Sequence, residues 1–291
     1  MEENIAEYPK KENSEAAIRR LKRFDSTKKG QNFLWGQIEY EIEERQLDID
    51  YFLYKIGRDK LTEPIIQSRV NELISYRREK EFTFQRNIDQ FANIFEIRRN
   101  EIIERLSKGN ILDIGIGRKG DPNNESYGEY LGRLNEKVKI ISLDIKRDLL
   151  LERKSSVQAN AIRLPFSDNS FDRIIACASM PMWTEHPSQV DDFFDEVVRV
   201  AKKGGEIWIT PISQIYLLPY LDKDWRKNED MFFIHSLIQK RVYEKLRELN
   251  TKKDLSLKLV RTFEAYDEKS NSYILDTTIS DPNRVIIKKK P

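Results

Sequence analysis

The feature that most constrains this chain is an apolar run that breaks into a cluster of glycines. Residues 111–114, Ile-Leu-Asp-Ile, are followed by Gly115, Gly117 and Gly120. Such a run is typical of a buried parallel strand that ends in a tight loop. Glycine is favoured there because the backbone must adopt positive φ and approach a ligand closely. The pattern Gly-x-Gly-x-x-Gly fits a dinucleotide-binding loop, and it also fits an ordinary glycine turn after a core strand.

The composition disfavours several classes of protein. Charged residues make up 34% of the 291 residues, but the net charge is only +2, so basic and acidic residues are interspersed. One cysteine, Cys177, excludes an internal disulfide and a cysteine-built zinc site, and two histidines leave little for a metal centre. No run approaches the roughly 18 apolar residues of a membrane span, and the N-terminus lacks the features of a signal peptide. We therefore expect a cytoplasmic protein without a metal or a membrane span.

The chain changes character at residue 109. Residues 1 to about 30 are polar and charge-rich, and we expect the start of the chain to be disordered. From Phe33 to about Lys108 the composition is that of helices, and the clearest helix is expected from about Glu81 to Lys108. It carries an apolar stripe with helical spacing, formed by Phe84, Ile88, Phe91 and Phe95. We predict a helical N-terminal region at 1–108, acting as a lid or a docking element, and a second domain at 109–291.

Strand-like and helix-like runs alternate in the second region, which predicts an α/β fold with a parallel sheet and helices on both faces. The expected strands include 111–114, 138–143, 172–177 and 206–210, and the expected helices include 127–134 and 190–201. Near the C-terminus, 259–263 and 273–279 could pair as a hairpin, and 284–288 would be the last strand. Ligands on such sheets bind beyond the carboxyl ends of the strands, so residues at those ends are candidates for a site.

The second strand ends on an acid, Asp144. A carboxylate there can accept hydrogen bonds from both hydroxyls of a ribose, and a helix N-cap is the alternative role. Asp113 and Asp144 are 31 residues apart. A dinucleotide fingerprint expects about twenty, so the spacing disfavours a nicotinamide-dependent oxidoreductase.

The third segment carries the motif Ala-Asn-Ala-x-x-Leu-Pro-Phe-x-Asp-Asn-Ser-Phe-Asp at 159–172. Here the sequence resembles the class I S-adenosylmethionine-dependent methyltransferases, in particular the branch that contains the ubiquinone and menaquinone C-methyltransferases. The resemblance continues through Lys203-Gly204-Gly205, similar to the family's turn before its fifth strand, and covers about residues 109–210. The glycine loop, the motif at 159–172 and the turn at 203–205 occur together and in this order, and this combination is what makes the resemblance specific.

The resemblance implies a Rossmann-like sheet, mostly parallel with an antiparallel last strand, and S-adenosylmethionine as cofactor. The residues that it implies for cofactor binding lie at strand ends: Asp113, Gly115 and Gly117 at the methionine part, Asp144 at the ribose, Asn160 and Ala161 at the adenine, and Cys177 near the methionine part. A sulfonium methyl is already activated, which is consistent with the lack of a clear catalytic dyad.

The acceptor side is less defined by the sequence. Glu185 and His186 follow the fourth strand, where either could act as a general base or could cap the next helix. The Asn/Asp-Pro-Pro-aromatic pattern of nucleic-acid amino-methyltransferases is missing, since Ser179-Met-Pro-Met stands in its place. Aromatic residues such as Phe233 could stack on a planar substrate or belong to the core.

Three hypotheses are compatible with the sequence. The first is a methyltransferase acting on a small molecule, with the N-terminal helices covering the site. The second is a macromolecular methyltransferase that uses the basic residues around Arg19–Arg23 to bind RNA or protein, which would give salt-dependent RNA binding. The third is an inactive scaffold or partner protein, whose long loop at 118–126 does not close on a cofactor. The acceptor, the atom methylated and the oligomeric state are not set by the sequence.

Overall fold

The computed structural model describes residues 14–78, 88–95, 97–116, 126–150, 155–177, 179–181, 183–212, 229–261, 264–267, 272–275 and 282–291. The glycines Gly117 and Gly120, the stripe residue Phe84 and the loop residues 118–125 lie outside these ranges. Among the described residues, no helix is both long and apolar enough to cross a bilayer.

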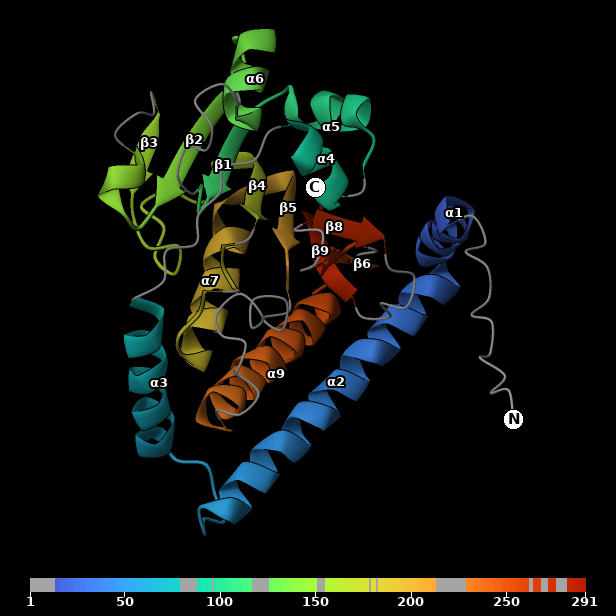
Figure 1. Cartoon of the computed structure of the whole chain (residues 1–291). Helices are drawn as coiled ribbons and strands as arrows, with labels where there is room; N and C mark the ends of the chain where they lie inside the picture. The colour runs from blue at the N-terminus through green and yellow to red at the C-terminus, as the bar shows by residue number, and fades with distance from the viewer. Residues whose placement is uncertain are drawn as a thin grey trace, which may run out of the picture.

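The helices and strands follow one another in the order shown in Figure 1. The helices are α1 (Ser14–Asp25), α2 (Lys28–Lys55), α3 (Glu63–Arg78), α4 (Ile88–Phe95), α5 (Arg99–Leu106), α6 (Tyr127–Leu134), α7 (Pro187–Val200) and α9 (Glu229–Thr251), with a short 3₁₀ helix η1 (Arg147–Leu150). The strands are β1 (Asn110–Ile114), β2 (Lys139–Asp144), β3 (Ser156–Gln158), β4 (Phe171–Cys177), β5 (Ala201–Thr210), β6 (Leu255–Arg261), β7 (Glu264–Asp267), β8 (Ser272–Leu275) and β9 (Pro282–Lys289).

The main sheet has the strand order β3-β2-β1-β4-β5-β9-β6. The strands from β3 to β5 pair in parallel, whereas β9, the last strand of the chain, is antiparallel to both β5 and β6. This confirms the predicted α/β sheet, mostly parallel with an antiparallel last strand. Because β1 lies between β2 and β4, residues that are distant in sequence meet at one edge of the sheet.

Alternate side chains of each strand enter two separate apolar clusters, as the period of two requires. Along β1, Leu112 and Ile114 pack in a cluster with residues of α2, α7 and α9. Ile111 packs on the opposite face, in a cluster with residues of α4, α5 and α6. Both faces of the sheet are therefore covered by helices, which the ribbon in Figure 1 makes visible.

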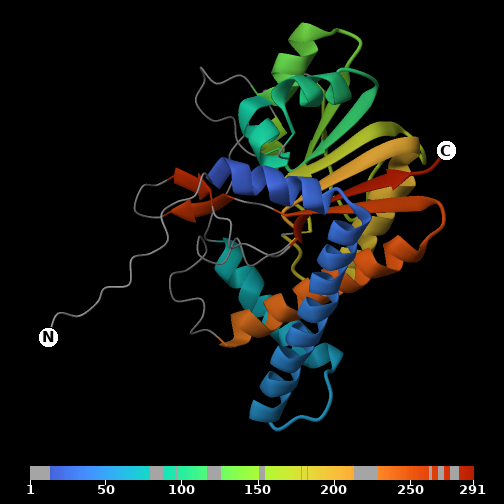
Figure 2. The ribbon, with the colours of Figure 1, turned by 90° about the vertical axis from the view of Figure 1, so that its right-hand side faces the viewer.

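The N-terminal helices share the core of the sheet. Leu34 and Ile38 of α2 are fully buried in the same cluster as the β1 residues Leu112 and Ile114. Figure 1 shows the long helix α2 beside α9, and the two helices cross in the view of Figure 2. Phe52 of α2 stacks on Phe233 of α9 with ring centroids 3.9 Å apart. Phe233 thus belongs to the core. The division at 108/109 stays a prediction.

The same helices also provide hydrogen-bond partners for the edge strand β6. The side-chain amide of Gln31 donates to the Leu259 carbonyl at 2.8 Å and accepts from the Leu259 N–H at 2.9 Å, so it replaces a neighbouring strand along β6. Beside it, Arg261 of β6 forms a buried ion pair with Asp25 at the end of α1. These contacts explain why α1 and α2 sit firmly against the edge strand.

The prediction of a single helix from Glu81 to Lys108 is wrong in one respect, because α4 and α5 are separate helices. Arg98 is extended and precedes the first residue of α5. A straight helix would have continued the apolar stripe of Ile88, Phe91 and Phe95 into Arg98 and Arg99, which are exposed. The break instead turns Ile102 and Leu106 into the core, where both are fully buried.

The expected hairpin between 259–263 and 273–279 is wrong in its first strand, although 273–275 do form a hairpin as part of β8. The strand β6 pairs with β9, and a separate hairpin forms between β7 and β8. Leu255 and Leu259 of β6 are buried in the main core, so the strand is needed at the edge of the large sheet. The last strand is confirmed, since β9 contains 284–288.

Candidate functional site

The carboxyl ends of three neighbouring strands lie level with one another. Ile114 of β1 is paired with Leu143 of β2 on one side and with Ala176 of β4 on the other. The next residue of each strand is then Gly115, Asp144 and Cys177. The Gly115 N–H donates to the Leu143 carbonyl at 2.8 Å, which continues the pairing past the end of β1. Three of the predicted site residues therefore stand side by side at this edge.

A small pocket opens at the end of β1. Three of the predicted residues, Asp113, Gly115 and Cys177, line it together with Ser142 of β2. The rest of the pocket wall is formed by Phe91 of α4, Ile116, Ser126, Tyr127, Gly128 and Ile140. Phe91 is almost fully buried and stacks on Tyr127 with ring centroids 4.5 Å apart. The predicted apolar stripe of the N-terminal region thus reaches the candidate site through α4.

Gly115 is the position where the backbone leaves the sheet. Its φ is +72°, in the left-handed region that favours glycine. A Cβ added there would lie 2.2 Å from the Cβ of Ser179, which follows β4. The hydroxyl of Ser179 is buried and has no hydrogen-bond partner among the described residues. A buried hydroxyl without a partner is costly, so its place beside the Gly115 backbone suits a polar ligand that would bind it.

The remaining predicted residues continue outward from the pocket. The Asp144 carbonyl accepts from the Ala159 N–H at 3.1 Å, and the Asp144 carboxylate accepts from the Lys146 N–H at 3.0 Å. The latter bond orients the carboxylate in a turn beyond the strand. Asn160 is exposed and its side-chain oxygen accepts from the Ile162 N–H at 3.2 Å, whereas Ala161 is buried. Asp144, Asn160 and Ala161 follow consecutive strands but do not line the small pocket.

The turn that follows Ala161 is held by two residues of α7. The Glu196 carboxylate accepts from the Leu164 N–H at 2.6 Å. The Arg199 guanidinium donates to the Leu164 carbonyl at 3.0 Å and to the Phe166 carbonyl at 2.7 Å. Arg199 also pairs with Glu196 at 2.7 Å and with Asp168 at 2.8 Å. Hydrogen bonds from Arg199 lower the pKa of Glu196 despite the opposing effect of burial.

His186 and Glu185 lie at the start of α7. His186 is the N-cap: its Nδ1 accepts from the Ser188 N–H at 3.2 Å. This bond puts the proton on Nε2, which lies 3.0 Å from a carboxylate oxygen of Glu63 on α3. Both ring nitrogens therefore have partners, and the imidazole links α7 to α3. The Glu185 N–H donates to the Gln189 side chain at 2.9 Å, as part of the same cap.

A second, larger cavity of about 500 Å³ lies between α2, α3, α9 and the first residue of α7. Its walls are partly apolar, with Ile49, Leu53, Leu61, Ile66 and Leu237, and partly charged, with Asp50, Asp59, Lys60, Lys240, Arg241 and Glu244. A volume of about 300–1,000 Å³ with mixed walls is typical of a small-molecule site.

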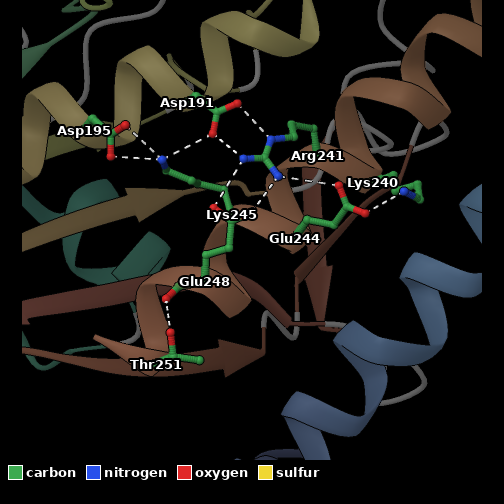
Figure 3. Close-up of polar contacts among 8 residues, drawn as sticks. All are labelled: Asp191, Asp195, Lys240, Arg241, Glu244, Lys245, Glu248 and Thr251. Carbon is green, nitrogen blue, oxygen red and sulfur yellow. Dashed lines mark hydrogen bonds and ion pairs between the residues drawn. The ribbon is translucent and has the colours of Figure 1, made fainter. Parts of the chain in front are cut away.

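An ion-pair network fixes α9, one wall of this cavity, against α7 (Figure 3). Arg241 binds Asp191 through two hydrogen bonds, and Lys245 pairs with Asp195 at 2.9 Å and with Asp191 at 3.2 Å. Burial raises the pKa of Asp191, but the hydrogen bonds from Arg241 and Lys245 outweigh it and lower that pKa below its ordinary value. Arg241 also pairs with Glu248 at 2.8 Å.

Four features of this region were not predicted from the sequence: Ser142, Ser179, the Glu196–Arg199 pair and the larger cavity. A buried serine has no sequence signal of its own, and the cavity depends on four helices that are far apart in the chain. The i, i+3 spacing of Glu196 and Arg199 indicates a helix pair, but not its distant partner. In the part of the chain that the structure describes, no group of three or more His, Cys, Asp or Glu residues is placed to hold a metal ion.

Comparisons with known proteins relate part of the chain to methyltransferases. Residues 122–209 match the model of a family described as a methyltransferase domain. Methyltransferase GfsG of Streptomyces halstedii is 32% identical over 136 residues, which are 43% of this chain and 47% of that protein. The chain thus spans about half the length of this curated relative.

Two solved structures illustrate the similarity. One is a methyltransferase of Thermotoga maritima described as a possible histamine N-methyltransferase, with 18% identity, a TM-score of 0.40, and coverage of 78% of this chain and 97% of that one. The other is the N-methyltransferase NodS of Bradyrhizobium japonicum, with 14% identity, a TM-score of 0.38, and coverage of 68% of this chain and 98% of that one.

Replacing Gly115 by alanine should destabilise the protein. The left-handed backbone alone costs a non-glycine residue about 1–2 kcal/mol, and the overlap with Ser179 adds to it. Urea unfolding measures the loss. The matched control is Gly132→Ala in α6, where no described atom lies within 4 Å of the added Cβ and the change should be neutral or slightly stabilising. Equal effects of the two substitutions would contradict this account of Gly115.

The Glu196–Arg199 pair predicts a pH-dependent contribution to stability. Because the folded state lowers the pKa of Glu196, the stabilisation is fully present above the ordinary glutamate value of about 4.3 and is lost as the pH falls through the lowered pKa. Glu196→Gln should therefore lower the urea midpoint at pH 7, and the difference from wild type should shrink towards pH 4 and below. Glu136→Gln, at an exposed position, serves as the control. A difference that stays constant with pH would refute the assignment.

Proposed function

Because the chain belongs to the class I S-adenosylmethionine-dependent methyltransferase family, we propose that it transfers a methyl group from this cofactor to a small-molecule acceptor. The observation that carries the proposal is the alignment of Gly115, Asp144 and Cys177 at three neighbouring strand ends. This edge of the sheet is where ligands bind in α/β proteins.

The residues present suit the proposed cofactor. In this proposal the backbone around Gly115, with Asp113 and Cys177, holds the methionine part, and the buried hydroxyl of Ser179 gains a polar partner there. The Asp144 carboxylate accepts hydrogen bonds from the ribose hydroxyls. Asn160 and Ala161, in the turn held by Arg199, would receive the adenine. Gly117 would extend the first group, and it lies outside the described residues.

The bound cofactor supplies a methyl group that is already activated on a sulfonium sulfur. The protein then has to align the acceptor and to exclude water, and it needs no strong base for an acceptor that is already nucleophilic. The structure supports this view of catalysis, since both nitrogens of His186 are engaged in the cap of α7 and in the contact with Glu63. Glu185 and His186 accordingly serve, in our proposal, to position α7 and α3 beside the acceptor.

In this proposal the cavity between α2, α3, α9 and α7 holds the body of the acceptor. The reacting atom must then extend towards the pocket at the end of β1, with which the cavity shares no described lining residue. Pro187, the first residue of α7, lines it, and α7 follows directly after the segment that leaves the carboxyl end of β4. The apolar walls would hold the body of the acceptor, and the charged rim would bind its polar groups. A concave cavity of this size suits a small molecule, whereas RNA binding requires an extended basic surface.

Replacing Asp144 by alanine should weaken the binding of S-adenosylmethionine at least tenfold. Hydrogen bonds to a charged group contribute about 1.5–3 kcal/mol each, and losing one or both would raise the dissociation constant by this amount or more. Isothermal titration calorimetry with S-adenosylmethionine and S-adenosylhomocysteine gives the measurement, with NAD as a negative control. Asp192→Asn, an exposed change on α7, should bind as the wild type does.

Two results of that titration would contradict the proposal. A wild-type protein that binds neither methyl-cycle ligand would favour an inactive scaffold. A protein that binds NAD alone would mean that the glycine loop serves a dinucleotide.

Narrowing the cavity should weaken the binding of the acceptor and leave the binding of the cofactor unchanged. Ile66→Trp on α3 places a larger side chain in the cavity wall, so the KM for a small acceptor should rise at least tenfold while cofactor affinity stays unchanged. S-adenosylhomocysteine release would be measured with a panel of small phenols, amines and carboxylic acids, and in parallel with total RNA and an unfolded protein. Gln67→Trp, at the exposed neighbouring position, is the control. Turnover with RNA or protein alone would replace the small-molecule proposal by the macromolecular one.

A further inference from the structure

The long helix α2 has apolar side chains on two opposite faces. One face is buried in the core and consists of Leu34, Ile38, Ile42, Ile49, Phe52 and Leu53. A helix at the surface of a globular protein ordinarily has one apolar stripe and a polar outer face. The second apolar face of α2 is therefore not accounted for by packing among the described residues.

We call the second face the outer stripe; it is made of Tyr40, Leu47, Tyr51 and Tyr54. Their exposed fractions are 55%, 62%, 63% and 82%. At 3.6 residues per turn, these four positions lie within about 60° of one another around the helix axis, opposite the buried face. Phe33 continues the spacing towards the N-terminus, but it is less exposed and packs on Phe24 with ring centroids 6.1 Å apart.

The outer stripe is large enough to contribute most of a specific interface. Large side chains bury about 150–250 Å² each when covered, so the exposed parts of these four present roughly 400–600 Å². That equals the largest apolar patch of a typical monomer, and a standard interface buries about 800 Å² on each partner. Flanking residues of the same helix would supply the remainder. Tyrosine is also among the residues that most often anchor interfaces.

The charges beside the stripe limit the kind of partner. Glu39, Glu43 and Asp50 are exposed beside the stripe, although Glu39 pairs with Arg247 of α9 at 3.0 Å and Asp50 also lines the larger cavity. These carboxylates oppose binding to an anionic membrane surface or to nucleic acid, whose phosphates they would repel. In an antiparallel second copy of α2, by contrast, Lys55 would lie opposite Glu39, since the two are each eight residues from Leu47. The partner is therefore a protein surface that offers aromatic and apolar side chains.

The spacing of the stripe fits a second copy of the same helix. Tyr40 precedes Leu47 by seven residues and Tyr54 follows it by seven. A two-fold axis through Leu47 would pair two antiparallel α2 helices, with Leu47 against its own copy and Tyr40 against the partner's Tyr54 at both ends. Such an isologous contact uses one patch twice, which is the commonest arrangement of oligomers.

We propose that the protein forms a homodimer through the outer stripe of α2, with the two helices antiparallel about Leu47. This inference is independent of the methyltransferase activity, since it rests on a helix face that points away from the sheet. The helix α2 then has two roles, because its inner face completes the core of one chain and its outer face joins two chains.

The first test is the mass of the full-length protein in solution. Light scattering after size exclusion at about 50 µM should give twice the chain mass of 34.6 kDa. The double variant Leu47→Glu/Tyr54→Glu should be monomeric, with unchanged circular dichroism, because both side chains are exposed. Leu134→Glu, the same change at an exposed leucine of α6, should remain dimeric. A monomeric wild type, or a double variant that stays dimeric, would overturn the proposal.

The second test addresses the antiparallel register. In a Leu47→Cys variant, a short bis-maleimide should link two chains, since the two-fold axis brings the residue next to its own copy. The natural thiol of Cys177 is buried, so the unmodified protein is the background control. Leu134→Cys should give no cross-linked dimer. A dimer of the correct mass that fails to cross-link through Cys at position 47 would show that the axis lies elsewhere.

Discussion

The parallel pairing of β1 with β2 on one side and β4 on the other is the constraint on which the candidate site depends. It brings Gly115, Asp144 and Cys177 level, although they come from three strands separated by helices and loops. The left-handed backbone at Gly115 then turns the chain away from the sheet just where Ser179 returns from β4. A shift of one residue in either pairing would move the side chains of that strand to the opposite face of the sheet, so the residues that line the pocket would no longer meet.

A chain of polar contacts extends from this edge to the helices. Arg199 and Glu196 of α7 hold the turn after Ala161, and Asp191 and Asp195 of the same helix hold α9. The helix α7 therefore connects the proposed adenine side with the proposed acceptor cavity. Its N-cap, His186, adds a contact to α3 through Glu63. A single amphipathic helix thus positions both halves of the site, with its apolar face fixed in the core by fully buried residues such as Phe193 and Val197.

The parts of the fold that could be predicted from the sequence are those with a local signal. These are the apolar run before Gly115, the acid that ends the run of β2, and the helical spacing of Ile88, Phe91 and Phe95. The structure has all three as expected. The break before α5 could not be seen, because nothing local distinguishes Arg98 from the outer face of a continuous helix. The partner of β6 was missed for another reason: hairpins are favoured by nearness in sequence, and only the burial of Leu255 and Leu259 requires β9 instead. Ser179 and Arg199 act across the fold, where one sequence gives no pairing information.

The N-terminal helices are best understood as part of the core that supports the site. Leu34 and Ile38 are as fully buried as the strand residues in their cluster, and Gln31 completes the hydrogen bonds of the edge strand. A lid that opened at α2 would expose this core and leave the buried charge of Arg261 without Asp25, which is costly. The helix α3 is attached to the same core by the buried Val70 and to α7 by the contact between Glu63 and His186. In the cavity between α2, α3, α9 and α7, the wall formed by α2 is therefore a fixed part of the core.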